Sequence, residues 1–299
     1  WRNIVKNTVI DRPTVTVIGG GLAGCEAAWA AANSGVAVTL IEMKPHKYTP
    51  AHHYKGLAEL VCSNSLKAAR HDSAAGLLKE EMRRLGSLCM EAAKECSVPA
   101  GGALAVDRDE FSLCVTEKIK NHPNITVTAQ EVTEVPEGPV IIATGPLTSD
   151  ALSEAIGKYF GSEADYLHFF DAAAPLVTAE SIDMSLAWWQ SRYDRGTPDY
   201  INCAMNKEQY EAFIQELTNA QEAEVHGFED KNVFEGCMPV EVMARRGVDT
   251  LRYGPLKPVG LTDPKTGKEP YAVVQLRQDN AQGTVYNLVG FQTHLTLVE

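Results

Sequence analysis

The feature that most constrains the fold is a glycine-rich turn between a β-branched run and an alanine-rich run. Residues 14–18, TVTVI, are typical of a buried strand, and GGGLAG follows at residues 19–24. The next residues, CEAAWAAANS, favour a helix that ends near Gly35, because alanine is a strong helix former and glycine suits a helix C-terminus. A second apolar run at residues 36–42 ends in Glu42. The sequence therefore predicts a β–α–β unit.

The spacing of these glycines, G-x-G-x-x-G, is typical of dinucleotide-binding turns. Gly19 permits the tight turn, Gly21 lets a diphosphate approach the backbone, and Gly24 lets helix and strand pack closely. Glu42 lies 23 positions after Gly19, close to the spacing of about 20 residues expected for a carboxylate that binds a ribose hydroxyl. The alternative is an ordinary structural turn with Glu42 facing solvent.

A second strand-like segment, VIIATG at residues 140–145, favours FAD over NAD as the dinucleotide. A buried strand that ends in Ala-Thr-Gly far downstream resembles the second contact strand of flavoproteins with two dinucleotide-binding parts. The predicted cofactor-binding residues are Gly19, Gly20, Gly21, Leu22, Ala23, Gly24, Glu42, Met43, Lys44, Thr144 and Gly145.

Beyond about residue 180 the pattern changes to polar helices and loops, followed by two runs typical of antiparallel strands at residues 271–278 and 284–292. We therefore predict an α/β fold: a Rossmann-like FAD-binding domain, with a parallel sheet and flanking helices, plus an inserted α+β substrate domain. The expected boundaries are 1–180 and 181–299. Residues 74–95 show helical spacing of apolar side chains, with Leu77, Leu78, Met82, Leu85, Leu88 and Cys89 on one side.

Composition and charge limit the class of protein. The 299 residues carry a formal net charge of −12, which argues against a surface that is basic throughout but permits a local basic groove. No apolar run approaches the about 20 residues that span a bilayer, and the first residues lack the apolar core of a signal peptide. The seven cysteines are odd in number and contain no C-x-x-C, as expected in a reducing compartment. We expect a cytoplasmic protein without a membrane partner.

Two of the cysteines lie in short motifs with turn residues beside them: Cys62 in LVCSNS and Cys237 in FEGCMP. There a thiol can be exposed and reactive, although from the residues alone a structural role is equally plausible. Four of the others, at 25, 89, 96 and 114, are interpreted as small buried hydrophobes, and Cys203 can be either, with a structural role favoured. The histidines at 46, 52 and 53 lack a carboxylate or cysteine at a suitable spacing, so no metal site is expected.

Long blocks of the chain resemble one known family. They include GGGLAGCEAAWAAANSGVAVTLIEM, AELVCSNSLK, FEGCMPVEVMARRG and GPLKPVGLTDPKTGKEPYAVVQLRQDN, and the resemblance runs from about residue 14 to the end. The family is the bacterial FAD- and folate-dependent tRNA (uracil-5-)-methyltransferases. The resemblance implies methylation of C5 of a T-loop uridine to ribothymidine, with 5,10-methylenetetrahydrofolate as carbon donor, FADH2 as reductant and NADH or NADPH to regenerate it.

The resemblance also implies roles for individual residues. The two functional cysteines of the family fall on Cys237, favoured as nucleophile, and Cys62, favoured as acid/base; the reverse assignment stays open. Basic residues after Cys237 are candidates for contacts to tRNA phosphates, with a solvated surface as the equal alternative. These residues are Arg245, Arg246, Arg252 and Lys257.

Family members continue past position 299 with a glycine-rich segment that returns to the flavin, so this chain is expected to lack part of its FAD site. The expected partners are the tRNA T-arm, folate and NAD(P)H, and the expected state is a monomer. Two alternative functions remain: a flavin-dependent oxidoreductase related to the flavoprotein that modifies the wobble uridine of tRNA, or a non-catalytic flavin-containing RNA-binding protein.

Overall fold

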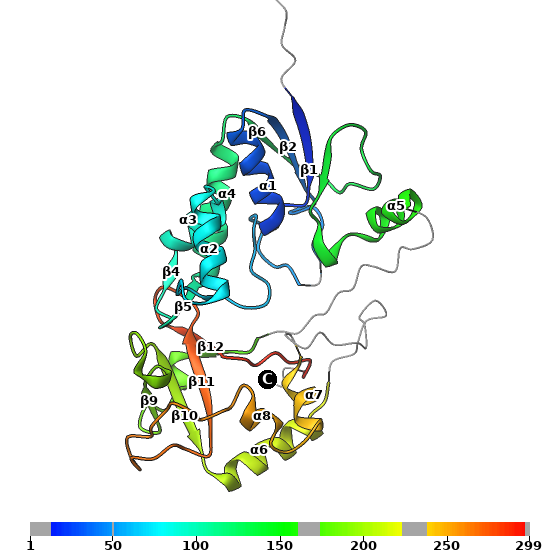
Figure 1. The fold of residues 1–299 in the computed structure, drawn as a ribbon. Helices are drawn as coiled ribbons and strands as arrows, with labels where there is room; N and C mark the ends of the chain where they lie inside the picture. Colours follow the sequence, from blue (N-terminus) through cyan, green and yellow to red (C-terminus); the bar gives the residue numbers. More distant parts are fainter. Residues whose placement is uncertain (1–12, 50, 161–173, 223–237, 297–299) are drawn as a thin grey trace, which may run out of the picture. The chain divides into compact units, whose positions relative to one another are not determined.

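The computed structural model describes residues 13–49, 51–160, 174–222 and 238–296 (Figure 1). The chain divides into two compact units. The first comprises Trp1–Ala58, Ser87–Cys89 and Val115–Ala164, and the second comprises Glu59–Gly86, Met90–Cys114 and Asp165–Glu299. The domain boundary at 180/181 stays a prediction.

A four-stranded parallel sheet forms the centre of the first unit, in the order β6-β2-β1-β7. Its strands are β1 (Thr14–Ile18), β2 (Ala37–Glu42), β6 (Ile125–Ala129) and β7 (Val140–Ile142). Helix α1 (Leu22–Asn33) packs against the sheet (Figure 1), and its side chains Cys25, Ala28 and Ala32 are buried there. Small side chains on this face allow the helix to approach the strands closely.

The predicted β–α–β unit is confirmed. β1 and β2 pair in parallel with Thr14 opposite Ala37, and α1 connects them. The helix ends at Ser34, and Gly35 follows with φ +85°, a left-handed conformation that glycine adopts without strain.

The helical run predicted over 74–95 is two helices, α2 (Ala74–Arg84) and α3 (Leu88–Glu95). They are separated at Gly86, whose φ of +79° is incompatible with a continuous α-helix. The apolar residues on the predicted side also differ in exposure: Leu88 is fully buried, whereas Leu85 is 87% exposed. The predicted helical spacing is therefore confirmed, but it belongs to two helices instead of one.

The second unit contains a five-stranded antiparallel sheet in the order β8-β12-β11-β10-β9. Its strands are β8 (Leu176–Thr178), β9 (Ala187–Trp189), β10 (Tyr200–Met205), β11 (Ala272–Gln278) and β12 (Val285–Leu288). A smaller sheet, β3-β5-β4, consists of β3 (Ser65–Ala68), β4 (Ser97–Val98) and β5 (Ala103–Val106). The antiparallel pair predicted near the end of the chain is confirmed as β11 and β12.

Helices α6 (Lys207–Asn219), α7 (Val240–Arg245) and α8 (Thr250–Tyr253) contribute to the core of this unit. Tyr210, Leu251 and Leu256 are completely buried there, so the unit has a hydrophobic core of its own. The remaining helices are α4 (Arg108–Asn121) and α5 (Asp150–Phe160), with 3₁₀ turns at Gly145–Leu147, Ala179–Ser181 and Arg192–Asp194. The predicted fold class, a parallel α/β part plus an α+β part, is confirmed. No helix in the described ranges is long and apolar enough to span a bilayer.

Candidate cofactor and substrate sites

Three loops meet at the carboxyl edge of the parallel sheet. The glycine turn follows β1, Glu42 is the last residue of β2, and Ala143 follows β7. Backbone bonds fix this arrangement: Gly19 N–H donates to the carbonyl of Ile41 at 2.8 Å, and Ala143 N–H donates to that of Ile18 at 2.8 Å. In an open α/β sheet this edge is where ligands bind. The structure thus brings the two segments that favoured FAD into contact.

The carboxylate of Glu42 is anchored at this edge. Its Oε2 accepts the Gly20 N–H at 2.6 Å, and its Oε1 accepts the Lys44 N–H at 3.0 Å. A carboxylate offers about four acceptor sites, so these two bonds leave capacity for ribose hydroxyls. Glu42 therefore does not simply face solvent, because both of its carboxylate oxygens accept backbone hydrogen bonds.

The glycines of the turn differ in what surrounds them, and this difference tests the fit to a diphosphate. A Cβ on Gly24 would lie 1.8 Å from the carbonyl oxygen of Gly19, and one on Gly20 would lie 2.5 Å from Leu57. A Cβ on Gly21 would meet nothing within 4 Å, so Gly21 borders open space. Helix α1 begins beside it without a side-chain cap, which leaves N–H groups available to an anion. The residues present fit the diphosphate of a dinucleotide.

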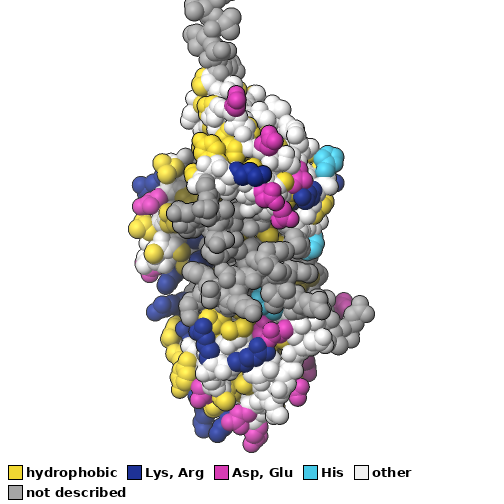
Figure 2. Space-filling model, turned by 90° about the vertical axis from the view of Figure 1, so that its right-hand side faces the viewer, with side chains coloured by type: hydrophobic (Ala, Val, Ile, Leu, Met, Phe, Trp, Pro, Cys, Tyr) yellow, Lys and Arg dark blue, Asp and Glu magenta, His cyan; other side chains and the backbone are white. Residues whose placement is uncertain are grey.

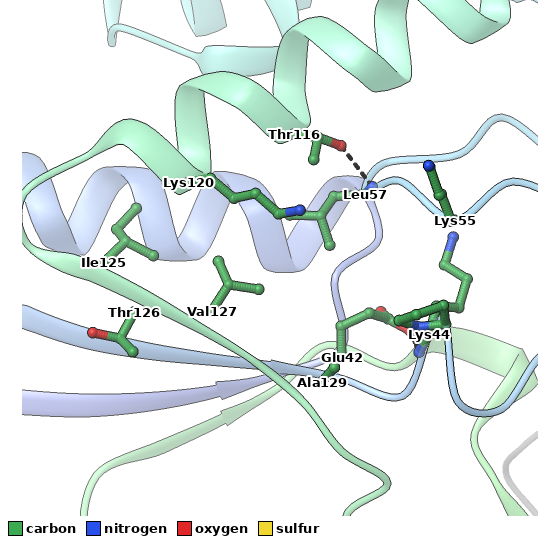
Figure 3. Close-up of a pocket in the computed structure, with 11 residues that line it drawn as sticks. Glu42, Lys44, Lys55, Leu57, Thr116, Lys120, Ile125, Thr126, Val127 and Ala129 are labelled. Atoms are coloured by element: carbon green, nitrogen blue, oxygen red, sulfur yellow. Dashed lines mark hydrogen bonds between the residues drawn. The ribbon is translucent and has the colours of Figure 1, made fainter.

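A cavity of about 440 Å³ opens beside Glu42 (Figure 3). Strand β6 contributes Val127, helix α4 contributes Thr116 and Lys120, and Lys55 lines the opposite side. Its size falls within the range of about 300–1,000 Å³ typical of small-molecule sites. The cavity therefore extends the Glu42 site in the direction of β6.

Lys44 does not point its ammonium group into open space. Its Nζ is buried and donates to the carbonyls of Tyr54 at 3.0 Å and Gly56 at 2.7 Å, so the side chain holds the loop that follows β2. At the end of β7, the hydroxyl of Thr144 lies 2.6 Å from that of Thr148, and Gly145 has φ +66°. Direct FAD contacts by these residues, and by Leu22, Ala23 and Met43, stay predictions.

The cysteines separate by burial. Burial, with smaller contributions from the carboxylates of Glu42 and Glu26, raises the pKa of Cys25 to about 12. Burial also raises the pKa of Cys89 and Cys203. Cys62 differs, because it is only half-buried and the amide Nε2 of Gln292 donates to its sulfur at 2.9 Å. Cys237 lies outside the described residues.

Sequence reasoning missed two residues near Cys62. Gln292 is 230 positions away in the chain, and no local motif marks it. Arg277 lies on β11, and its Nη2 donates to the hydroxyl of Ser63 at 2.9 Å and to Asn64 Oδ1 at 2.8 Å. The available signal was the only charged residue in the strand-like run YAVVQLRQ.

The four predicted RNA-binding residues have different environments. Arg245 pairs with Glu222, and Arg252 donates to the carbonyl of Tyr271 at 2.9 Å while its guanidinium lies 4.0 Å from that ring. Arg246 and Lys257 are exposed. Figure 2 shows Lys and Arg beside Asp and Glu on one face, a mixed surface that accords with the acidic net charge. Their RNA contacts stay predictions.

The described residues contain no group of three or more His, Cys, Asp or Glu side chains placed to hold a metal ion.

Comparison with known proteins agrees with the site. Methylenetetrahydrofolate–tRNA-(uracil-5-)-methyltransferase TrmFO of Acetivibrio thermocellus is 64% identical over 282 residues, which cover 94% of this chain and 64% of the relative. The proteins of that name from Geotalea uraniireducens and Lactobacillus johnsonii are each 62% identical, and the aligned parts cover 65% and 64% of their lengths. The chain thus spans about 64–65% of the length of these relatives. The family resemblance inferred from the sequence blocks is confirmed.

The fold has a solved counterpart. The structure of Aquifex aeolicus GidA in its form II crystal matches with a TM-score of 0.63 at 14% identity, over 96% of this chain and 51% of that one. At this identity the match supports the fold alone. A family model described as "Glucose inhibited division protein A" matches residues 14–299. The chain therefore belongs to the glucose inhibited division protein A family.

Proposed function

We propose that this chain is the main part of an FAD- and folate-dependent tRNA methyltransferase that converts a T-loop uridine to ribothymidine. The carbon donor is 5,10-methylenetetrahydrofolate. The observation that carries the proposal is the 64% identity over 282 residues to a relative named for this reaction. Glu42, Gly21 and the uncapped start of α1 add a site that suits FAD.

Each residue of the dinucleotide site has a defined task in this proposal. Glu42 binds ribose hydroxyls of the adenosine half, and the N–H groups at the start of α1 hold the diphosphate next to Gly21. Gly19, with φ +98°, makes the turn that brings the helix terminus to the edge of the sheet. When bound and reduced, FAD supplies the electrons that convert the transferred carbon into a methyl group.

The thiols activate the target base. Addition of a thiolate, assigned to Cys237, forms a bond from sulfur to C6 of the uracil and moves electron density towards C5, which then forms a bond to the donor carbon. The bonds from that carbon to the nitrogens of the donor break as the carbon is transferred and reduced, and tetrahydrofolate is the leaving group. Cys62 accepts the proton from C5, and elimination releases the first thiolate. The side chain of Gln292 donates a hydrogen bond to the sulfur of Cys62.

The proposal includes the tRNA T-arm as partner, NADH or NADPH as the source of electrons, a monomeric protein and a cytoplasmic location. Arg245, Arg246, Arg252 and Lys257 are the proposed phosphate contacts, in a protein whose net charge is acidic.

The deciding experiment supplies the complete protein, loaded with FAD, with unmodified tRNA, NADPH and 5,10-methylenetetrahydrofolate labelled in its methylene group. We expect label at C5 of one T-loop uridine in the wild type and none in Cys237→Ala or Cys62→Ala, with tRNA binding retained in both. Label that arises only from S-adenosylmethionine contradicts the proposal. Full turnover by either Cys variant points instead to the related flavin oxidoreductase, and RNA binding without any turnover to a scaffold.

A further inference from the structure

A second cavity lies within the antiparallel unit. It measures about 300 Å³, and the residues that line it come from strands β11 and β12, helix α7 and the loops beside them. Its polar side chains are Ser63, Arg277, Asn287 and Gln292, and Phe291 is among its apolar ones. This volume is at the lower end of the range of about 300–1,000 Å³ for ligand sites, so the cavity suits one small ring system.

The cavity contains a buried positive charge with neutral partners. Arg277 is 6% exposed, and its guanidinium donates to Asn64 Oδ1, to the Ser63 hydroxyl and, at 3.4 Å, to Asn287 Oδ1. Burial lowers the pKa of Arg277 from its usual value, as desolvation of a cation requires.

Asp279 is the carboxylate that acts on this charge, and its attraction partly opposes the lowering of the Arg277 pKa by burial. Within the described parts of the chain Arg277 forms no ion pair, and Asp279, two positions away on the chain, is bound by Arg108 at 3.0 Å. Buried charges in proteins are normally paired. An electron-rich oxygen of a ligand in the cavity would give the guanidinium a direct partner.

The same cavity is linked to Cys62. Gln292, one of its lining residues, donates to the sulfur at 2.9 Å. Ser63 and Asn64, the next two residues of the chain, both accept hydrogen bonds from Arg277. A short loop therefore carries the thiol at one end and the guanidinium's acceptors at the other.

We propose that this cavity binds the target uracil ring and that Arg277 stabilises the negative charge on a ring carbonyl oxygen when a thiolate adds to C6. The inference rests on the proposed function. In that step the sulfur–C6 bond forms, the C5–C6 π electrons move into the conjugated carbonyl, and the oxygen becomes an enolate. Arg277 keeps its proton throughout, and the charge returns to sulfur on elimination. Asn287 and Phe291 complete a polar and an apolar wall for a flat dione ring.

The experiment uses the FAD-loaded complete protein and a T-arm RNA with 5-fluorouridine at the target position. Because the C–F bond resists cleavage, the sulfur–C6 adduct persists and is counted as a covalent protein–RNA band. We expect Arg277→Gln to slow adduct formation about 100-fold or more, the usual effect of removing one oxyanion donor, with RNA affinity little changed. Arg277→Lys keeps a positive charge and should recover part of the rate.

The variant Asn287→Asp tests the positive charge of Arg277 separately from the role of Arg277 in holding the loop. The new carboxylate would face the guanidinium from the present position of Asn287 Oδ1, so it neutralises the charge while leaving in place the bonds from Arg277 to Ser63 and Asn64 that hold the loop. We expect slow adduct formation with an unchanged melting temperature. If Arg277 has only a structural role, Asn287→Asp should form the adduct at the normal rate. That result would overturn the inference, even if Arg277→Gln fails to fold. Arg192→Gln is the control, because Arg192 is a half-buried arginine of the same unit outside the cavity, and its adduct rate should match the wild type.

Two further outcomes are distinct. If the wild type forms no adduct at all, the proposed function fails together with the inference. If Arg277→Gln forms adduct normally but binds tetrahydrofolate at least tenfold more weakly, the cavity is a folate site and only the inference fails.

Discussion

At the scale of single residues, Glu42 connects the glycine turn to the end of β2. Its two oxygens each accept one backbone N–H, from Gly20 and from Lys44. A ligand hydroxyl can therefore bind a carboxylate whose position is already fixed. This preorganisation reduces the entropy lost on binding.

Glu42→Gln should weaken FAD binding by about 10- to 100-fold, because hydrogen bonds to a charged group contribute about 1.5–3 kcal/mol. The dissociation constant is measured by quenching of flavin fluorescence during titration of FAD-free protein. Glu131→Gln is the matched control, since Glu131 forms an exposed ion pair with Lys47 in the same unit. Equal affinities for Glu42→Gln and the wild type would remove Glu42 from the site.

The thiol of Cys25 should resist alkylation in the native protein. Because its pKa is raised to about 12, it remains protonated at pH 8, and its thiolate accumulates only as the pH rises towards 12. Iodoacetamide at pH 8 followed by peptide mass spectrometry should find Cys25 unmodified in folded protein and modified in urea. Rapid native labelling at pH 8 would show that the site opens or that the thiolate is stabilised.

At the scale of elements, the turn between β1 and α1 combines two different requirements for glycine. Gly24 is required by packing, since a Cβ would collide with the carbonyl of Gly19. Gly21 has ordinary extended backbone with φ −72° and free space around it. Gly24 is therefore required by the fold, whereas Gly21 leaves space for the ligand that we propose.

Gly21→Ala and Gly24→Ala should consequently have different effects. We expect Gly21→Ala to change the free energy of unfolding by less than about 1 kcal/mol yet to lower FAD affinity at least tenfold, because the methyl group occupies the approach of the diphosphate. Gly24→Ala should destabilise the protein by about 1–3 kcal/mol or more. Urea unfolding of the FAD-free variants and FAD titration measure the two quantities. If Gly21→Ala binds FAD normally, the diphosphate does not lie at this turn.

At the scale of the whole molecule, the balance of charge limits how the proposed tRNA partner can bind. A net charge of −12 repels a polyanion, so the proposed function requires local cations that hold tRNA. Among the predicted contacts, Arg252 is engaged by Tyr271, whereas Lys257 is exposed on the chain after α8. Lys257 is thus the sharper test of the predicted surface.

Lys257→Gln should weaken tRNA binding and reduce the slope of log K against log salt by about 1, the effect of losing one phosphate contact. Filter binding measures this slope at salt concentrations from about 50 to about 200 mM. Lys207→Gln, which removes an exposed lysine beside Glu211 on α6, is the control and should leave the slope unchanged. An unaltered slope for Lys257→Gln would assign that lysine to the solvated surface.

The sequence alone determined what depends on near neighbours. The strand, the glycine turn, helix α1 and the acid that ends β2 lie within 29 residues, and their spacing specifies a β–α–β unit because local sterics and hydrogen bonding decide it. The resemblance of long blocks likewise assigned the family, since it requires no knowledge of contacts. The break at Gly86 was missed, because helical periodicity continued across it.

Only the tertiary structure decided which distant side chains meet. Arg277 and Asn64 are 213 positions apart, and Gln292 and Cys62 are 230 apart, yet each pair is in hydrogen-bond contact. The five-stranded sheet brings them together through strand register and core packing, which no local pattern encodes. The same holds for Lys44, whose ammonium group donates to two carbonyls of the loop after β2, contacts that the sequence did not predict. The local sequence determines short-range geometry, whereas burial and long-range pairing exist only once the whole chain has packed.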